Sequence, residues 1–202
     1  MPLISVDNVL PGVRLGLWRI EESVGTFISE YPELGYLERV IEGYGSESRR
    51  IEILAVHALL RRMGIDGVTL CHEASGKPYL TDGTNIGISH TKGCAAVIHS
   101  PHAKVAVDVE YIDERVGRVA ERMLRSDEKA ETLLLKLLHW CAKETLYKLY
   151  SEDRLSLAEM CLLAVKGNDT EGIITVKNDR RGETLDVSYR VSEGFVITYV
   201  AL

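Results

Sequence analysis

Residues 105–111 of this chain read Val-Ala-Val-Asp-Val-Glu-Tyr. The three valines alternate with Ala106, Asp108 and Glu110, and a period of two is typical of a β-strand with one buried face. Asp108 and Glu110 therefore point the same way, with Cα atoms about 7 Å apart along the strand. Two carboxylates this close repel each other unless a positive group lies between them. The stretch predicts either a site for an oxygen-preferring cation such as Mg2+ or an edge strand with a solvated acidic face.

The composition is that of an ordinary globular protein. The chain has 202 residues, of which 46% are hydrophobic and 27% charged, so it could form one domain or two small ones. Its formal net charge of -6 argues against a nucleic-acid-binding surface, since phosphate backbones are held by clustered Lys and Arg. An anionic ligand would therefore need a local basic pocket.

The sequence carries no targeting signal that we recognise. The first seven residues lack the basic region and long apolar run of a secretory signal, and no stretch is apolar for long enough to span a bilayer. The four cysteines are widely spaced and form no CxxC pair, which favours reduced core residues over disulfides or a zinc site: Cys71, Cys94, Cys141 and Cys161. We expect a cytoplasmic protein that spans no membrane.

The apolar spacing predicts a mixture of helices and strands. Helices are expected over 32–41, 46–63, 116–124 and from 126–128 toward Leu149, and strands over 13–20, 68–71, 85–90, 94–99, 160–165, 173–177, 185–191 and 195–200. The order strand, helix, strands occurs before residue 100 and again after it. The sequence therefore predicts an α+β fold made of two similar halves.

Three groups of polar residues are candidates for a site. Arg49 and Arg50 lie in the first turn of the 46–63 helix. Cations there oppose the helix dipole, so a bound anion would be stabilising. Residues 89–93, Ser-His-Thr-Lys-Gly, suggest a tight anion-binding connection between strands. Glu144 and Lys148 share one face of the last helix with Trp140, which we expect to serve packing. Each group also has a simpler interpretation. The arginines could be solvated, residues 89–93 could be an ordinary polar turn, and Glu144 and Lys148 could form a helix ion pair.

Four blocks of the sequence occur in the order found in a known enzyme family. They are Gly-Lys-Pro at 76–78, Asn-Ile-Gly-Ile-Ser-His-Thr at 85–91, Val-Asp-Val-Glu at 107–110, and Trp-Cys-Ala-Lys-Glu-Thr-Leu-Tyr-Lys at 140–148. Together they resemble the 4'-phosphopantetheinyl transferases, specifically the two-lobed type that activates surfactin synthetase. Ala106 stands where that family often has Gly, and Tyr150-Ser151 replaces a frequent Gly-Lys-Gly segment.

The resemblance implies a pseudo-dimer of two α+β lobes in one chain, residues 1–102 and 103–202, with the cofactor in the cleft between them. Such an enzyme, a holo-[acyl-carrier-protein] synthase, moves the 4'-phosphopantetheine arm of coenzyme A onto a serine of an apo acyl or peptidyl carrier protein. Adenosine 3',5'-bisphosphate is released, and the reaction requires Mg2+. We expect a monomer, since the repeated order of elements would supply both lobes from one chain.

The resemblance also implies roles for particular residues. Asp108, Glu110 and Glu144 would hold Mg2+, and Glu144 is a candidate to take the serine proton, directly or through water. Lys148 would offset charge on the leaving phosphate, with Lys143 as a second candidate near the pyrophosphate. The adenosine end and its 3'-phosphate would be held by the remaining polar residues of the blocks and by the helix start: Lys77, Ser89 and His90, with Arg49 or Arg50.

Two other functions stay open. A Mg2+-dependent phosphohydrolase would use the same carboxylates to position water, and a non-catalytic coenzyme A-binding protein could keep the fold alone. Surface contacts decide whether the carrier belongs to fatty-acid, polyketide or peptide synthesis, and the sequence does not locate those contacts.

Overall fold

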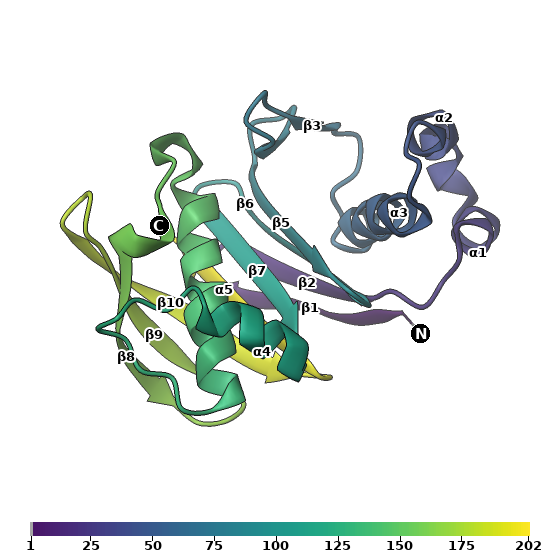
Figure 1. Cartoon of the computed structure of the whole chain (residues 1–202). Coiled ribbons are helices and arrows are strands. Elements are labelled where there is room, and N and C mark those ends of the chain that lie inside the picture. The colour runs from purple at the N-terminus through teal and green to yellow at the C-terminus, as the bar shows by residue number, and fades with distance from the viewer. Residues whose placement is uncertain (1) are drawn as a thin grey trace.

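The computed structural model describes residues 2–202 and contains five α-helices and eleven strands (Figure 1). The N-terminal elements are β1 (Leu3–Leu10), β2 (Val13–Arg19), α1 (Val24–Glu30), α2 (Glu38–Glu42), α3 (Glu47–Arg62), β3 (Leu70–His72), β4 (Pro78–Leu80), β5 (Asn85–Thr91) and β6 (Cys94–Ser100). The rest are β7 (Val105–Tyr111), α4 (Glu114–Glu121), α5 (Leu133–Leu149), β8 (Met160–Gly167), β9 (Glu171–Asn178), β10 (Glu183–Ser192) and β11 (Phe195–Ala201). Short 3-10 segments cover Pro32–Leu37, Ser151–Asp153 and Leu157–Glu159.

The strands form two main sheets, and the predicted α+β class is confirmed. The first has the order β1-β2-β6-β5 and the second the order β7-β11-β10-β9-β8, while β3 and β4 pair as a separate hairpin. The first sheet ends with β6 at Ser100 and the second begins with β7 at Val105. The boundary predicted at residues 102 and 103 thus falls in the connection between the sheets.

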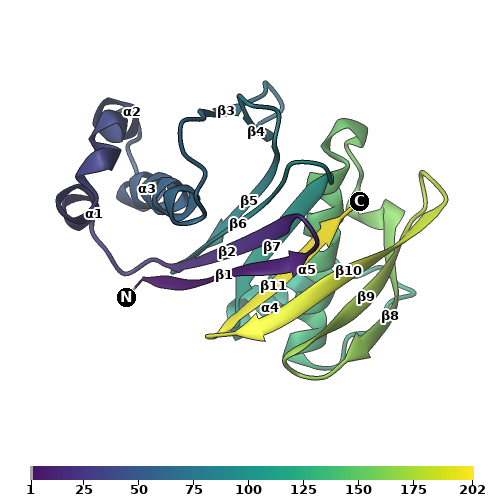
Figure 2. The ribbon, with the colours of Figure 1, turned by 180° about the vertical axis from the view of Figure 1, so that it is seen from behind.

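The two main sheets are held together by a shared apolar core. Side chains of β2 and β6 meet side chains of β7 and β11, including Leu15, Ile98, Val107 and Ile197, and these four are almost completely buried. Seen from behind, β1 and β2 lie beside β10 and β11 (Figure 2). Ion pairs cross the same junction, because Arg19 bonds Glu193 and Arg190 bonds Asp7.

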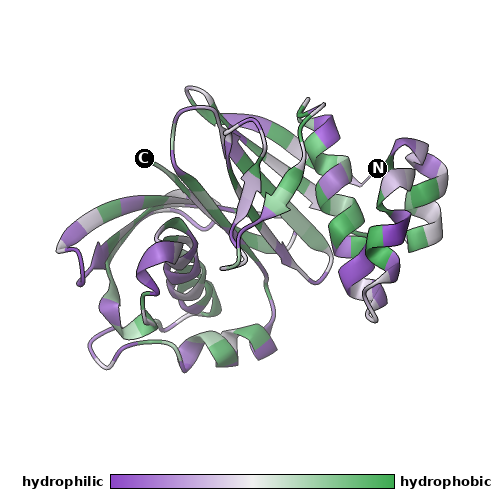
Figure 3. Cartoon of the chain, turned by 90° about the horizontal axis from the view of Figure 1, so that it is seen from above, coloured by the Kyte–Doolittle hydropathy of each residue, from purple (hydrophilic) through white to green (hydrophobic). Residues whose placement is uncertain are grey.

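One long helix covers each main sheet. Ser46 caps α3, whose Leu54, Leu59 and neighbours pack with Trp18 of β2. Thr132 caps α5, whose apolar side packs against the second sheet at Val187 and Val196. In Figure 3 green apolar and purple polar positions alternate along the helices, as expected for elements with one buried face.

The close approach of β5 to β7 depends on Gly87. A Cβ built at Gly87 would lie 3.1 Å from Ala106 Cα and 3.3 Å from the Val107 nitrogen. These are backbone atoms, which cannot turn aside as a side-chain end can, so a larger residue would push the strands apart. The small Ala106, where the resembling family often has Gly, faces this contact.

Two predicted boundaries are wrong. Strand β5 continues to Thr91, so residues 89–91 are strand and only Lys92 and Gly93 form the turn before β6. Helix α5 begins at Leu133 rather than near Ser126–Glu128, because Glu128 turns inward and bonds to the helix instead of starting it. Pattern analysis also missed β1 and α1, which are half-buried or short and show weak periodicity.

Within residues 2–202, we find no helix of the length and apolar character that crossing a bilayer requires.

Candidate functional site

Two hydroxyl–carboxylate hydrogen bonds join β5 to β7. Ser89 donates to Asp108 Oδ1 at 2.9 Å, and Thr91 donates to Glu110 Oε2 at 3.0 Å. Both pairs are separated by the same 19 positions. Alternate residues of a strand share a face, so the two hydroxyls and the two carboxylates form matching rows. The structure therefore confirms that Asp108 and Glu110 are on one face, and that face meets β5 rather than open solvent.

Lys148 of α5 completes the contacts at Asp108. Its ammonium donates to Asp108 Oδ1 at 2.7 Å, to Ser89 Oγ at 2.8 Å and to the Val107 carbonyl at 3.2 Å. Lys148 therefore pairs with Asp108 of the strand and not with Glu144 of its own helix. The ion pair between Glu144 and Lys148 that the helix spacing offered as an alternative is absent from the ion pairs of residues 2–202.

The second oxygen of Asp108 has no partner. Asp108 is 4% exposed, and its Oδ2 is buried without a hydrogen bond from any described residue. A buried carboxylate oxygen without a donor is costly, so it marks a place where a cation or a donor from a ligand would bind favourably.

Glu110 accepts hydrogen bonds on both of its oxygens. Thr91 donates to Oε2, and the indole of Trp140 donates to Oε1 at 3.0 Å. Trp140 packs against the core of the second sheet, as expected, and its partly buried indole N–H also donates to this carboxylate. Thr91 was not among the predicted site residues, although its place two residues after Ser89 on the same strand face was a usable signal.

Glu144 faces this cluster from α5. Burial raises its pKa, as do the nearby charges of Asp108 and, more weakly, Glu110, while Lys148 lowers it. Burial likewise raises the pKa of Glu110, with the Trp140 hydrogen bond opposing and Asp108 adding to the effect. The three carboxylates are thus close enough to repel one another, which is the electrostatic setting in which a divalent cation is stabilising.

These carboxylates do not yet form a closed set of ligands. Among residues 2–202, no three His, Cys, Asp or Glu side chains already stand in a metal-binding arrangement. The contacts explain why: Lys148 holds one oxygen of Asp108, and Thr91 and Trp140 hold Glu110. The free Asp108 oxygen and the all-oxygen donor set still fit Mg2+ in their chemistry.

A second polar group lies on the next position of β5. His90 Nε2 accepts from Arg49 at 2.6 Å, and Glu52 contacts both His90 and Arg49 at 3.3 and 3.2 Å. Burial lowers the pKa of His90, Glu52 raises it, and Arg49 lowers it again. The group borders a cavity of about 330 Å³ whose apolar wall includes Ile53 and Pro78. The group therefore offers N–H donors beside an apolar wall, with the Arg49 charge already paired to Glu52.

Of the two arginines, the structure brings only Arg49 to His90. The Arg50 guanidinium instead bonds the Tyr44 carbonyl at 2.6 Å, which holds the chain before α3. Lys77 also lies apart, since its ammonium is 4.0 Å from Glu152 of the second half. Only the backbone around Lys77, at Gly76 and Pro78, borders the His90 cavity.

Lys143 is not at the site, although the sequence suggested it for the pyrophosphate. Its side chain is fully buried, bonds Glu128 at 2.5 Å and donates to the Met123 carbonyl at 3.2 Å. Glu128 also takes the Leu162 and Arg125 backbone N–H groups. Lys143 is one helix position from Glu144, and a turn of about 100° between neighbours moves it to another face.

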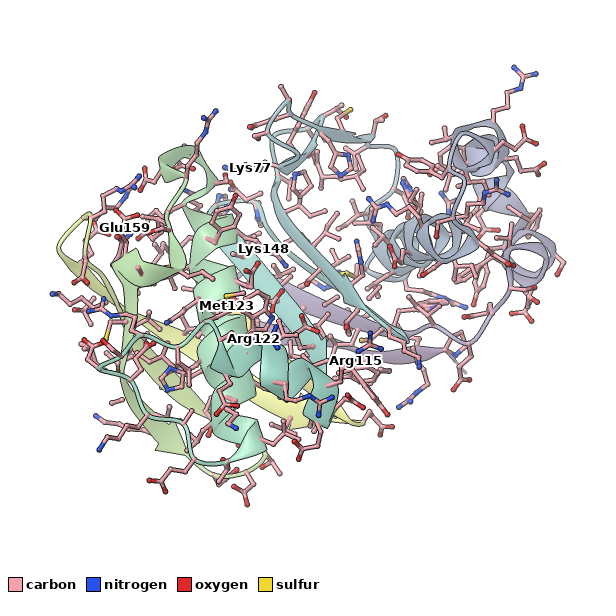
Figure 4. The ribbon with its side chains drawn as sticks, viewed as in Figure 1. Lys77, Arg115, Arg122, Met123, Lys148 and Glu159 are labelled. Atoms are coloured by element: carbon pink, nitrogen blue, oxygen red, sulfur yellow. The ribbon has the colours of Figure 1, made fainter. Side chains whose placement is uncertain are left out.

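A cavity of about 500 Å³ lies between the two halves beside Lys148. Its walls come from the β3–β4 hairpin and β5 on one side and from the start of β7 and the end of α5 on the other, and Lys77 and Lys104 line it. In Figure 4 Lys77 lies above Lys148, and Arg115 lies lower and to the right, on α4. Lys148 therefore stands where this cavity meets the carboxylate cluster.

Helix α4 presents unpaired arginines beside α5 (Figure 4). Arg115, Arg118 and Arg122 are exposed, and no carboxylate of residues 2–202 lies within ion-pair distance of them. They occur at helical spacings of three and four, so they share a face with the 44%-exposed Val119. Glu114 and Glu121 lie on the same helix, and Glu121 pairs with Lys136, so arginines are in excess on this surface but do not stand alone.

Neither the protein-family models nor the curated proteins that were searched match this sequence. What the site does must therefore follow from its motifs and its own geometry.

Proposed function

We propose that this protein is a Mg2+-dependent 4'-phosphopantetheinyl transferase that moves the arm of coenzyme A to a serine of an apo carrier protein. The observation that carries the proposal is the buried, unpartnered Asp108 oxygen, on a carboxylate that Lys148 contacts and that lies near Glu110 and Glu144. All four of these residues belong to the sequence blocks that resemble the family, and folding brings them together from one strand and one helix. The two halves of the chain would be the two lobes, with coenzyme A between them.

The cation would be held by Asp108, Glu110 and Glu144, whose oxygens suit Mg2+. When bound, Mg2+ neutralises charge that builds on the pyrophosphate as it is cleaved. Lys148 already touches Asp108 and Ser89 and lies at the edge of the 500 Å³ cavity. Its ammonium would stabilise the leaving phosphate, and the Ser89 hydroxyl would orient both groups.

Glu144 is proposed as the base. The carrier serine oxygen forms a bond to the phosphorus that bears pantetheine, and the bond from that phosphorus to the bridging oxygen breaks. The hydroxyl proton passes to Glu144, directly or through water. Among residues 2–202 no side-chain hydrogen bond occupies the Glu144 carboxylate, so it is open to accept the proton.

We place the 3'-phosphate beside Arg49 and His90, with the adenosine along the apolar wall of the 330 Å³ cavity. The earlier assignment of Lys77 to the same phosphate is replaced by a place at the 500 Å³ cavity, because that is where its side chain lies.

We assign the carrier protein to the basic face of α4. An acidic surface of the carrier would complement Arg115, Arg118 and Arg122, and Val119 would supply an apolar contact. Complementary charge at such a surface speeds encounter more than it tightens the final complex.

The test is a transfer reaction. Purified protein, coenzyme A and Mg2+ are incubated with an apo carrier, and the intact mass of the carrier is followed. The expected result is a mass gain equal to one phosphopantetheine, dependent on Mg2+ and on the carrier serine. Consumption of coenzyme A without any carrier would favour the phosphohydrolase instead, and binding without consumption would favour a non-catalytic protein. Several carriers in parallel would show which pathway it serves.

A further inference from the structure

Glu110 differs from Asp108 in the kind of donors that hold it. Asp108 is bonded by the Ser89 hydroxyl and by the charged Lys148. Glu110 is bonded only by neutral groups, the Thr91 hydroxyl at 3.0 Å and the Trp140 indole at 3.0 Å, one on each oxygen. Neutral donors orient a carboxylate without cancelling its charge.

The two donors come from different parts of the fold. Thr91 is the last residue of β5 in the first sheet, and Trp140 lies in the middle of α5. Glu110 is near the end of β7, between them. A long, flexible glutamate side chain is therefore held at three points by three separate elements. Both bonds are partly buried, so water competes with them less than at the surface.

Each carboxylate oxygen has two lone-pair directions, and each of these donors uses one. The remaining lone pair on each oxygen stays free to meet a cation. This is the arrangement in which outer groups orient a metal ligand, and losing one such group usually costs about 10–100-fold in metal affinity or activity.

We propose that Thr91 and Trp140 are positioning residues that fix Glu110 for the cation. This inference rests on the proposed function and adds to it two residues that touch neither coenzyme A nor the cation. Ala106 and the small Gly87 contribute indirectly, because the close approach of β5 to β7 brings the Thr91 hydroxyl within reach of Glu110.

The test uses matched variants of the full chain. Thr91→Val removes the hydroxyl at nearly constant volume, and Thr91→Ser restores it. Trp140→Phe removes the indole donor. Thr175→Val is the control for the first change, since Thr175 also donates a hydroxyl hydrogen bond to a carboxylate, Asp186 at 2.8 Å, but between paired strands of the second sheet. Trp18→Phe is the control for the second, because Trp18 is buried and its N–H has no partner among residues 2–202.

The readout is Mn2+ binding, followed by the loss of the free-ion signal in electron paramagnetic resonance, with and without coenzyme A. Thr91→Val and Trp140→Phe should each weaken Mn2+ binding by about 10–100-fold, while Thr91→Ser and both controls stay near the wild-type value. The affinity for coenzyme A without metal should not change. In transfer assays the Mn2+ concentration for half-maximal rate should rise far more than the maximal rate falls, which a general loss of stability would not produce.

Fluorescence gives an independent check. The chain has two tryptophans, so Trp18→Phe leaves Trp140 as the sole indole. Mg2+ titration of that variant should change Trp140 emission in proportion to metal binding.

The outcomes separate this inference from the proposed function. If the wild type transfers the arm but Thr91→Val and Trp140→Phe bind Mn2+ within about two-fold of it, the positioning role is wrong and the transferase assignment stands. If the wild type binds no Mn2+ with or without coenzyme A, both are overturned.

Discussion

Ser89 links more of the proposed site than any other hydroxyl in it. Its oxygen donates to Asp108 at 2.9 Å and accepts from Lys148 at 2.8 Å and from the Val109 backbone N–H at 3.2 Å. One donor and two acceptor positions are all that a hydroxyl offers, so Ser89 is fully used. It therefore fixes how strand and helix meet around Asp108, whatever ligand binds there.

Glu144 should be the most sensitive single position for activity. Glu144→Gln keeps the size and one ligand oxygen but removes the charge and the basic lone pair. We expect the transfer rate at saturating Mg2+ to fall by about 100-fold to 10,000-fold, because general-base catalysis contributes that much. The measurement is the rate of carrier mass gain. Circular dichroism should show an unchanged fold, and a rate within a few-fold of wild type would leave Glu144 without a catalytic role.

Glu128 should make stability depend on acid pH. Burial alone would raise its pKa, but the His139 imidazole 3.4 Å away and hydrogen bonds from Lys143 and two backbone N–H groups lower it to about 2, against an ordinary 4.5. A lowered pKa stabilises the fold fully above pH 4.5, and the stabilisation is lost as the pH falls toward 2. The shift corresponds to on the order of 3 kcal/mol, since its carboxylate is completely buried.

Urea unfolding of wild type and Glu128→Gln measures this effect. The two should differ strongly in free energy of unfolding at pH 7, and the difference should shrink between pH 5 and pH 3. Glu131→Gln, at an exposed glutamate in the same segment, is the control and should show no such convergence. A difference that is constant with pH would contradict the assignment.

At the scale of elements, the charged residues of α5 serve two purposes, one in the core and one at the proposed site. Lys143 is buried with Glu128, which ties the segment before the helix to its side. Glu144 and Lys148 face β7 and β5 instead. The same helix thus anchors the segment before it and carries the proposed site. A substitution that breaks the Lys143–Glu128 pair is therefore expected to disturb Glu144 and Lys148 as well.

Helix α4 should govern recognition of the carrier. Replacing Arg115, Arg118 and Arg122 together by Glu reverses the charge of its exposed face. The carrier concentration for half-maximal rate should rise about tenfold or more, and the effect should weaken at high salt. Arg39→Glu, at an exposed arginine of α2 far from α4, is the control (Figure 1). Unchanged carrier kinetics would place docking elsewhere, and a changed affinity for coenzyme A would show a wider disturbance.

For the whole molecule, the shared core between the sheets predicts that both halves unfold together. Ile98 is completely buried in that core. Ile98→Ala should cost about 2–5 kcal/mol. The exposed Ile173 of β9 is the control, and its change to Ala should cost little.

The two tryptophans report the halves separately. Trp18 lies in the first half and Trp140 in the second, so Trp140→Phe and Trp18→Phe backgrounds give one probe each. In both backgrounds Ile98→Ala should shift a single transition by the same amount. Two separate transitions would mean that the halves are independent domains joined by a weak contact.

The sequence alone determined the α+β class, the long helices and the alternating strand with Asp108 and Glu110 on one face. These follow from the spacing of apolar residues, because a strand or helix with one buried side must repeat apolar residues at its own period. It also brought Glu144 and Lys148 onto one helix face. The sequence did not predict the half-buried strand β1 or the short helix α1, because the apolar periodicity of both is weak.

Only the tertiary structure decided which residues meet. Arg49 rather than Arg50 reaches His90, Lys143 goes to the core, Lys77 turns to Glu152, and Trp140 bonds Glu110. Each choice depends on elements distant in the chain. Local spacing gives the direction of a side chain on its own element, but packing determines which partner stands opposite.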